Sequence, residues 1–181
     1  MKRIVFLLVL SITVIAVQSQ TNFTTGSLVT SKNESMNESI RISKGKLTTQ
    51  SGKSYRADEL KSFTIQSANY ISYENDFYKE ITTGKLVTLY QKVTDNRNER
   101  IFNGAEVVGF AQTTSGGVGD YYILTSSTGK LDFVNKKNFK SYFLKMINGH
   151  DSLAAQIVSG SLGYAQIKEV TDKYNSELSS T

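Results

Sequence analysis

Apolar and polar residues alternate along much of the segment from Ile40 to Val134, which is the period of a β-strand with one buried face. In SIRISKGKLTTQSGKSY the apolar positions occur in short groups around Gly45 and Gly52, which predicts short strands joined by tight turns. Further strands are expected in NYISYENDFYKEI, GKLVTLYQKV, IFNGAEVVGFAQT, DYYILTSS and KLDFV. TDNRNER is expected to be a polar turn between two of them.

The apolar spacing changes after Asn135, which is a candidate helix N-cap. Phe139, Phe143 and Ile147 then lie on one helical face, as the period of 3.6 residues requires. Three short helices are expected, over residues 136–147, 152–159 and 164–174.

Runs of strands followed by runs of helices predict an α+β fold. We expect an antiparallel β-sheet or a partly open barrel over about residues 40–134, followed by a cluster of three short helices over about residues 135–175. No helical crossover separates the strands, which argues against a parallel sheet.

The first 19 residues predict a secretory signal peptide. A basic pair at positions 2 and 3 precedes an apolar run, and Val17 and Ser19 suit a cleavage site before Gln20. The run is shorter than the roughly 18 residues of a membrane-spanning helix, although an uncleaved anchor is the alternative. We expect export to the periplasm, the cell surface or the medium, with no membrane span in the mature chain.

The remaining chain predicts one domain. Residues 20–39 are rich in Ser, Thr and Asn, and we expect a flexible polar leader with at most one short strand at Ser27–Thr30. Residues 40–178 are expected to form a single α+β domain, a usual size for one hydrophobic core.

Composition excludes several chemistries. The chain has no cysteine, so disulfides and thiol catalysis are impossible, and its one histidine, His150, follows a predicted helix and suits a capping role. The net charge of +5 comes from basic residues scattered among acids, which indicates no nucleic-acid surface. Ser51-Gly52-Lys53-Ser54 resembles the end of a phosphate-binding loop but lacks its first glycine and its helix, so we expect a hairpin turn. We expect no catalytic residue, cofactor or metal.

A tyrosine cluster is the candidate ligand contact. Tyr70, Tyr73 and Tyr78 lie near Glu74 and Asp76, an arrangement that could stack and hydrogen-bond a sugar or a peptide. The alternative is that these rings fill the core of the sheet. A hydrolase based on Glu74 or Asp76 is a third and more remote hypothesis.

The glycine cluster at Gly116, Gly117 and Gly119 predicts a hairpin loop with positive φ angles, because no helix follows it to bind an anion. The loop is expected to join strands at Val107–Gln112 and Tyr121–Thr125. The second strand is apolar on both faces, which predicts that the C-terminal helices cover one of them.

The C-terminal part has a layout that resembles small exported proteins of Bacteroidota. It combines the Tyr-Tyr strand DYYIL, an F-x-x-x-F helix, a short helix with the pattern L-A-x-x-I-x-x-G and a final helix that ends in Tyr174-Asn175. The resemblance covers about residues 105–175 and implies an origin and an architecture, but no activity. Together these features predict an exported, non-enzymatic binding or structural module of the cell envelope, with a glycan or a protein as partner. The alternative is a carbohydrate- or peptide-binding protein that uses the tyrosine-rich sheet face.

Overall fold

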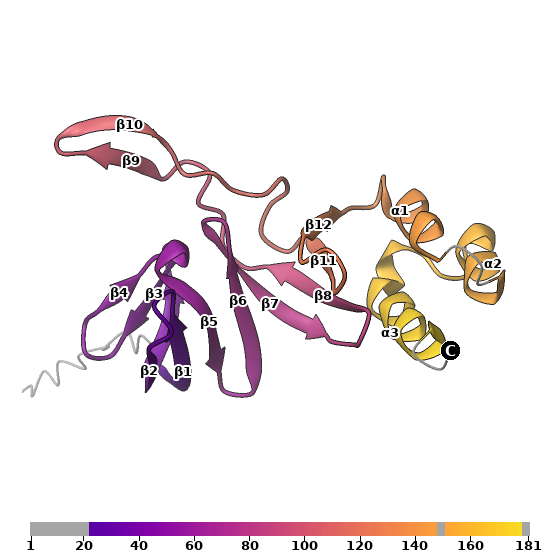
Figure 1. Cartoon of the computed structure of the whole chain (residues 1–181), viewed down its shortest axis with the longest axis horizontal. Coiled ribbons are helices and arrows are strands. Elements are labelled where there is room, and N and C mark those ends of the chain that lie inside the picture. Colours follow the sequence, from indigo (N-terminus) through magenta and orange to yellow (C-terminus); the bar gives the residue numbers. More distant parts are fainter. Residues whose placement is uncertain (1–21, 148–150, 179–181) are drawn as a thin grey trace, which may run out of the picture.

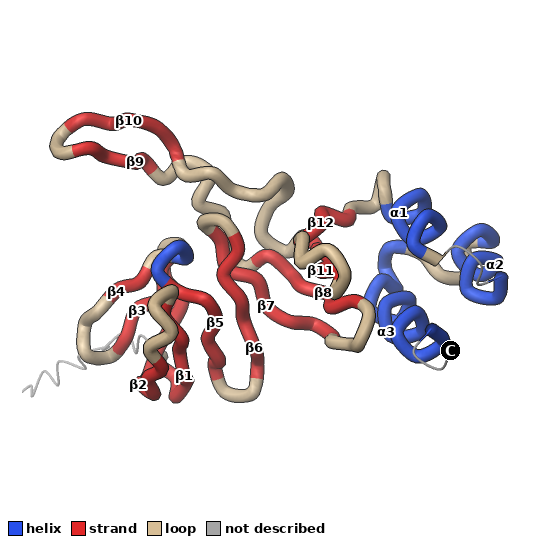
Figure 2. Tube along the Cα trace, in the orientation of Figure 1, coloured by secondary structure: helices blue, strands red, loops and turns tan. Residues whose placement is uncertain are grey.

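The computed structural model describes residues 22–147 and 151–178. It is mostly β-sheet, with its α-helices at the C-terminal end of an elongated molecule (Figures 1 and 2). The strands are β1 (Thr24–Thr30), β2 (Ser35–Ser43), β3 (Lys46–Thr49), β4 (Ser54–Tyr55), β5 (Leu60–Ile65), β6 (Ala68–Tyr73), β7 (Asp76–Thr82), β8 (Val87–Lys92), β9 (Arg100–Asn103), β10 (Glu106–Phe110), β11 (Tyr121–Thr125) and β12 (Leu131–Val134). A 3₁₀ turn, η1 (Ala57–Glu59), precedes β5.

Ten of the described strands form one antiparallel sheet in the order β12-β11-β8-β7-β6-β5-β1-β2-β3-β4. The order has two ends and does not close on itself, so the predicted α+β class is confirmed and the sheet is open. Most connections are hairpins, as the sequence predicts. At the turn between β2 and β3, Lys44 and Gly45 both have positive φ, which suits a two-residue hairpin turn.

The predicted flexible leader is wrong for most of its length. β1 lies inside the sheet between β2 and β5, and β2 begins at Ser35. The core-facing positions of β1 are Gly26, Leu28 and Thr30, so only one of them is a large apolar residue. Gly26 is required there because an added Cβ would lie 2.1 Å from the carbonyl oxygen of Thr64 on β5. The strand is therefore held by close packing and backbone pairing rather than by the apolar pattern on which sequence prediction depends.

The predicted helices are present, as α1 (Phe139–Met146), α2 (Asp151–Ser159) and α3 (Ile167–Leu178), with a 3₁₀ turn, η2 (Tyr164–Gln166), before α3. They pack on one face of β8, β11 and β12 (Figure 1). The residues that share this core are Val87, Leu89, Ile123, Val134, Phe139, Phe143, Ile147, Leu153, Ile157, Leu162, Ile167, Val170 and Tyr174. The predicted apolar face of the first helix is thus the one that is buried.

Asn175 of α3 fixes the last helix to the sheet. Its Oδ1 accepts hydrogen bonds from the amides of Leu86 (3.2 Å) and Val87 (3.1 Å), and its Nδ2 donates to the carbonyl of Val87 at 2.9 Å. One side chain therefore pairs backbone groups at the start of β8. Gly84 makes the approach possible, since a Cβ there would lie 2.0 Å from the Cγ of Asn175.

β11 has two apolar faces, as predicted. Ile123 belongs to the core beneath the helices, with Tyr121 packed against it. Tyr122 belongs to a second core on the other face, with Tyr78, Tyr90 and Leu131. A third core lies under the N-terminal half of the sheet and contains Leu28, Ile40, Leu47, Ala57, Leu60, Phe63 and Phe77.

The glycine loop before β11 bends the chain, but it is not the predicted hairpin. Gly116 and Gly119 have positive φ angles of 87° and 93°, as expected. However, β10 pairs with β9, whereas β11 pairs with β8 and β12. The loop therefore connects two separate sheets. Sequence alone could not distinguish the two cases because it does not show which strands pair.

Some predictions fall outside the described residues. The signal peptide over residues 1–19 and the site of its cleavage lie there, as do His150 and the predicted helix end at Asn148-Gly149. Ser51-Gly52-Lys53-Ser54 is described, and it forms the turn into β4 with Gly52 at a φ of 93°.

Candidate functional site

A β-hairpin projects from the body of the protein (Figure 1). It consists of β9, β10 and the two-residue turn Gly104-Ala105, and we call residues Arg100–Phe110 the arm. Within the described residues, β9 and β10 are hydrogen-bonded to each other and to no strand of the large sheet. A two-stranded ribbon of this kind is marginally stable in water unless something packs on it.

The arm exposes large apolar side chains. Phe102 is 57% exposed, Val108 59% and Phe110 62%, and Ile101 and Val107 are also exposed. Soluble proteins usually expose such residues singly, and several together on one element mark an interaction surface. The arm is the part of the described structure where they gather most densely.

The sequence prediction of a single strand over IFNGAEVVGFAQT missed the arm. A glycine at the first of two loop residues is a recognised hairpin feature, and Gly104-Ala105 could have been used to find the turn. Gly104 has a φ of 64°, the left-handed conformation that such a turn requires. Val108 is the additional residue where the register of β9 and β10 shifts, and it forms a β-bulge.

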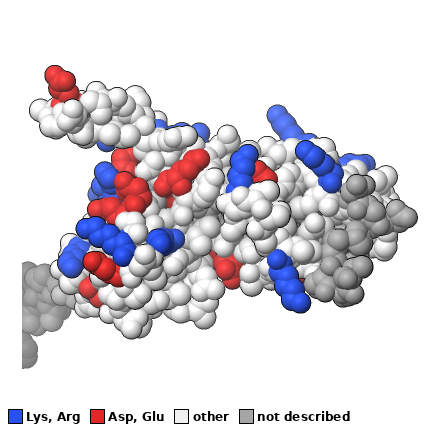
Figure 3. Space-filling model, viewed as in Figure 1, with Lys and Arg blue, Asp and Glu red and all other residues white. Residues whose placement is uncertain are grey.

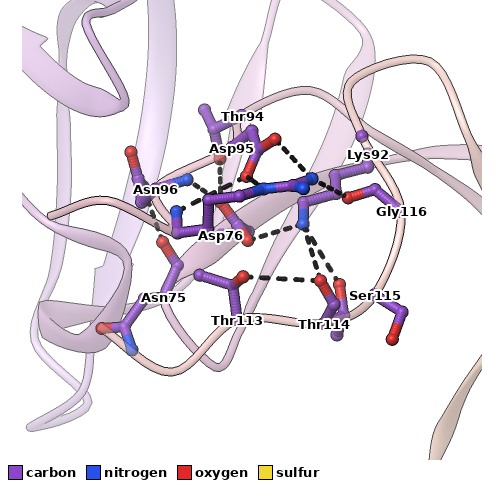
Figure 4. Close-up of polar contacts among 12 residues, drawn as sticks. Asn75, Asp76, Lys92, Thr94, Asp95, Asn96, Thr113, Thr114, Ser115 and Gly116 are labelled. Atoms are coloured by element: carbon purple, nitrogen blue, oxygen red, sulfur yellow. Dashed lines mark hydrogen bonds and ion pairs between the residues drawn. The ribbon is translucent and has the colours of Figure 1, made fainter. Parts of the chain in front are cut away.

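A buried ion pair lies where the arm joins the sheet (Figure 4). Oδ2 of Asp76, at the start of β7, lies 2.9 Å from Nζ of Lys92, at the end of β8, and both side chains are 0% exposed. Charged side chains in the interior are costly to desolvate. They are tolerated where further hydrogen bonds satisfy their remaining donors and acceptors. We call the ion pair and its partners Thr94, Asn96 and Thr114 the anchor network.

Asp76 holds the segment that enters the arm. Its Oδ1 accepts hydrogen bonds from the amide of Asn96 (3.0 Å) and from Oγ1 of Thr94 (3.1 Å). Thr94 in turn accepts from the amide of Phe77 at 2.8 Å. Asn96 Nδ2 donates to the carbonyl of Asn75 at 2.6 Å and to that of Gly45 at 3.1 Å. Residues 94–96 are therefore tied to two turns of the sheet and to the start of β7.

Lys92 holds the segment that leaves the arm. Its Nζ donates to the carbonyl oxygen of Thr114 (3.2 Å) and to Thr114 Oγ1 (3.3 Å). Thr114 Oγ1 is also 2.5 Å from the hydroxyl of Tyr78 and donates to that of Tyr122, which donates to the carbonyl of Ser115. A single ion pair thus connects both segments that flank the arm.

A second contact joins the same two segments at the surface. Arg97 donates to Asp95 through Nε (2.8 Å) and to the carbonyl of Gly116 through Nη2 (2.5 Å). The hydrogen bond from Arg97 lowers the pKa of Asp95 below its ordinary value. On the far side of the base, Asn75 Nδ2 donates to the carbonyl of Gln112 at 2.6 Å. The base of the arm is therefore fixed while its strands project.

The tyrosines around the anchor network are held as neutral phenols. Burial raises the pKa of Tyr122 to about 12, with a smaller opposing effect from its hydrogen bond with Thr114. Burial likewise raises the pKa of Tyr78. A neutral hydroxyl can donate a hydrogen bond and accept another, which the chain Tyr78–Thr114–Tyr122–Ser115 requires.

The predicted tyrosine site does not exist as one exposed face. Tyr78 is 0% exposed and packs edge-to-face on Tyr122, so it is a core residue and not a ligand contact. Tyr70 is on the opposite face of β6 from Tyr73 and stacks on Phe63 at 4.7 Å. The alternative that the rings fill the core is correct for Tyr78, whereas Tyr70 is half-buried and packs against the N-terminal core. Of the three predicted contacts, Tyr73 lines a cavity.

That cavity has a volume of about 260 Å³ and lies at the edge of the second core. Its lining includes Tyr73, Glu74 and Asp132, together with the loop Thr113–Ser115 that the anchor network positions. The volume is slightly below the usual range for small-molecule sites, which is roughly 300–1,000 Å³. An aromatic ring beside carboxylates and hydroxyls is chemistry that suits a sugar unit or a short peptide segment.

The two carboxylates of the remote hydrolase hypothesis are not equivalent. Asp76 is buried and paired with Lys92, so it cannot contact a substrate. Glu74, in the turn after β6, is exposed at the cavity. Asp76 is therefore not available as a catalytic group, and Glu74 cannot pair with it as acid and base.

The described residues contain neither a metal-binding cluster nor a membrane-spanning helix. No group of three or more histidine, aspartate or glutamate side chains in residues 22–147 and 151–178 is placed to hold a metal ion. In the same residues, no helix has the length and apolar character needed to cross a membrane.

Comparison with known proteins identifies no relative, since no family model, no curated protein and no solved structure matches this chain. Inferences about function therefore rest on the residues of the chain itself.

Proposed function

We propose that the protein is an exported, non-enzymatic binding module of the cell envelope, and that it contacts a protein partner through the arm. The observation that carries this proposal is the exposed apolar surface of Phe102, Val108 and Phe110 on an element that projects from the sheet. Apolar side chains exposed together in this way mark interaction sites in soluble proteins.

The anchor network supports the same proposal. A binding element gains affinity when it is held in place before the partner arrives, because less conformational freedom is lost on binding. The network fixes both segments at the base of the arm through the buried pair of Asp76 and Lys92. Buried charges are a costly way to gain stability, and a positioning role explains their presence at this point.

Export is supported by the sequence alone. The basic pair, the apolar run and the cleavage site before Gln20 predict it. Sequencing the N-terminus of protein recovered from the envelope fraction tests this part. A chain that begins at Gln20 is expected, and a chain that retains Met1 in the cytoplasm would contradict it.

Photo-crosslinking tests the arm. A photoreactive amino acid at Phe102 is expected to give discrete adducts in cells, whereas the same residue at Val158 is the matched control. Val158 is a 55% exposed apolar position on α2, remote from the arm (Figure 1). Equal labelling at both positions would refute a binding role for the arm. Turnover of a glycan, peptide or ester library that one point substitution abolishes would refute the non-enzymatic part.

The cavity beside Tyr73 supports a second candidate function, the binding of a carbohydrate or a peptide. Tyr73→Ala is expected to weaken ligand binding in a glycan and peptide array, with a smaller loss of stability than at a fully buried ring, because Tyr73 is only partly buried against Tyr78. Tyr78→Ala is the contrasting variant, since removal of a fully buried ring costs about 3–5 kcal/mol of stability. Binding that survives Tyr73→Ala would exclude this candidate.

A further inference from the structure

The ion pair of Asp76 and Lys92 differs from the other ion pairs of the described chain. Figure 3 shows acidic and basic side chains spread over the surface, where water solvates them. Asp76 and Lys92 are both 0% exposed, whereas in each other ion pair of the described residues both side chains are at least 25% exposed. A buried pair of charges is costly to desolvate, so its conversion to neutral groups is favoured.

The amine of Lys92 is directed at the carboxyl group of Asp76 (Figure 4). Two of its contacts are with Thr114, whose carbonyl oxygen and Oγ1 lie 3.2 Å and 3.3 Å from Nζ. The third is with Oδ2 of Asp76 at 2.9 Å. Because a carbon–oxygen bond is about 1.2 Å long, Nζ lies no more than about 4.1 Å from Cγ of Asp76. Once Nζ has given up a proton, its lone pair therefore faces the carboxyl carbon.

The two oxygens of the Asp76 carboxyl group have different surroundings. Oδ1 accepts hydrogen bonds from the amide of Asn96 (3.0 Å) and from Oγ1 of Thr94 (3.1 Å). Oδ2 lies beside Nζ and accepts no hydrogen bond of favourable geometry from the described residues. Donors aimed at one oxygen stabilise the negative charge that develops there when a nucleophile attacks the carbon, as in an oxyanion hole. The other oxygen is then the leaving group.

We propose that Lys92 and Asp76 condense to an isopeptide bond, which joins β7 covalently to β8. The lone pair of Nζ forms the new bond to Cγ, and the bond between Cγ and Oδ2 breaks. The ammonium group supplies two protons to Oδ2, which leaves as water, so that one carboxylate and one ammonium group become a neutral amide. The reaction requires no oxidant and no further reactant. Freshly folded protein holds the ion pair, and the link accumulates afterwards.

The interior of the protein favours this reaction in two ways. Groups that are held in contact react as though each were present at roughly 10⁵ M or more, because no freedom is lost to bring them together. In addition, the product is a neutral amide, which is less costly to bury than two charges. The same two groups in open water stay ionised and solvated, and they do not condense.

The link preserves the anchor network. The amide keeps Oδ1 as the acceptor for Asn96 and Thr94, and it keeps one N–H as a donor to Thr114. Since the chain has no cysteine, no disulfide is available to join these strands. A force applied to the arm enters the sheet through the segments that Asp76 and Lys92 hold. A covalent bond at this point prevents that force from separating β7 and β8, whatever the arm contacts.

Tryptic peptide mapping of aged, purified protein tests the link. Trypsin cleaves after Lys79 and Lys85, so residues 62–79 and 86–97 stay together only if Asp76 is joined to Lys92. The expected product is a branched peptide of these two segments that is lighter than their sum by one water. Its yield is expected to rise with time at a rate independent of protein concentration. Folded, aged protein that gives no branched peptide overturns the proposal.

Lys92→Arg is the matched variant, since it keeps the positive charge but a guanidinium group does not lose its proton to become a nucleophile. We expect neither a branched peptide nor a loss of water. Loss of water from this variant would mean that Asp76 reacts with the backbone, and it would contradict the link. Lys130 and Asp132 provide an internal control, because they lie 3.4 Å apart but are exposed, and they are expected to stay unlinked. An equal link at that pair would rule out burial as its cause.

Thr94→Val tests the role of the hydrogen bonds to Oδ1. It removes one of the two donors and is expected to slow formation of the branched peptide about tenfold or more. Thr94→Ser restores a hydroxyl and is expected to recover the rate. Circular dichroism checks that both variants are folded. An unchanged rate in folded Thr94→Val would refute the assignment of Oδ1 as the oxygen that carries the developing charge.

Discussion

Asp76 and Lys92 form a fully buried ion pair, with 2.9 Å between Oδ2 and Nζ, that connects the two segments flanking a projecting hairpin. The carboxylate binds the segment before the arm, and the ammonium group binds the segment after it. Because each charge is completed by hydrogen bonds to these segments, the pair positions the arm relative to the sheet.

Removing one partner of this pair leaves an uncompensated charge in the interior. Lys92→Met is expected to lower the free energy of unfolding by about 3–5 kcal/mol, as urea denaturation would measure. Adding Asp76→Asn removes the remaining charge and keeps an acceptor for the amide of Asn96, so the double variant is expected to recover much of the loss. A loss below about 1 kcal/mol for Lys92→Met would contradict a structural role for the pair.

Gly116 is expected to tolerate no side chain. It has a φ of 87°, and a Cβ would lie 2.7 Å from both the ring of Phe133 and the hydroxyl of Tyr122. Gly116→Ala is expected to cost about 2–4 kcal/mol, from the left-handed backbone and the close contacts together.

Two neighbouring glycines supply matched controls for Gly116. A Cβ added at Gly119 would meet no atom within 4 Å, but the φ of this residue is 93°. Gly119→Ala is therefore expected to lose only the backbone cost of about 1–2 kcal/mol. A Cβ added at Gly117 would also meet no atom within 4 Å, and the φ there is not positive. Gly117→Ala should therefore leave the stability nearly unchanged. Equal losses at all three positions would show that contacts in this loop do not matter.

The buried tyrosines predict a loss of stability at high pH. Burial raises the pKa of Tyr90 and of Tyr122 to about 12, whereas a tyrosine in the unfolded chain titrates near pH 10. Between these values the unfolded chain has lost protons that the folded chain still holds. The stabilisation is therefore complete below about pH 10 and is lost as the pH rises toward 12.

Urea denaturation at several alkaline pH values would measure this loss. Each such tyrosine contributes a slope of about 1.4 kcal/mol per pH unit between the two pKa values. Tyr122→Phe should reduce the slope by one such contribution. A free energy of unfolding that stays constant up to pH 12 would contradict the burial of these phenols.

Asn175→Ala is expected to loosen the last helix. It leaves the amide of Val87 and the amide of Leu86 without their acceptor, and unpaired groups of this kind cost about 1–3 kcal/mol each. Hydrogen exchange at Leu86 and Val87 should accelerate with the drop in stability. Asn98→Ala, at an exposed asparagine, is the control and should change neither quantity.

The periodicity of apolar residues was sufficient to predict most elements. Phe139, Phe143 and Ile147 form the buried face of α1 as predicted, and β11 has its two apolar faces. The same signal failed at β1, where a glycine and a threonine occupy core positions. It also predicted one strand where β9 and β10 are two, because the spacing of apolar residues does not mark the turn at Gly104-Ala105.

The candidate site was predictable only in part. Tyr73 lies beside a cavity, as the ligand-binding hypothesis for the tyrosine cluster requires. Tyr70 and Tyr78 are instead packed against other rings. Burial of a tyrosine depends on what lies across the strand, which the spacing of tyrosines along the chain does not reveal. The ion pair was not predicted at all, since Asp76 and Lys92 look like two ordinary surface charges in the sequence.

By itself, the sequence determined that strands precede helices, the α+β class and the helical face that is buried. These properties follow from the local spacing of side chains, because the period of a helix or strand places regularly spaced residues on one face. Only the tertiary structure decided that Asp76 meets Lys92, that β10 pairs with β9 rather than β11, and that Phe102 and Phe110 remain exposed. Each of these depends on which strands pair and in which register, and pairing is a property of the whole sheet.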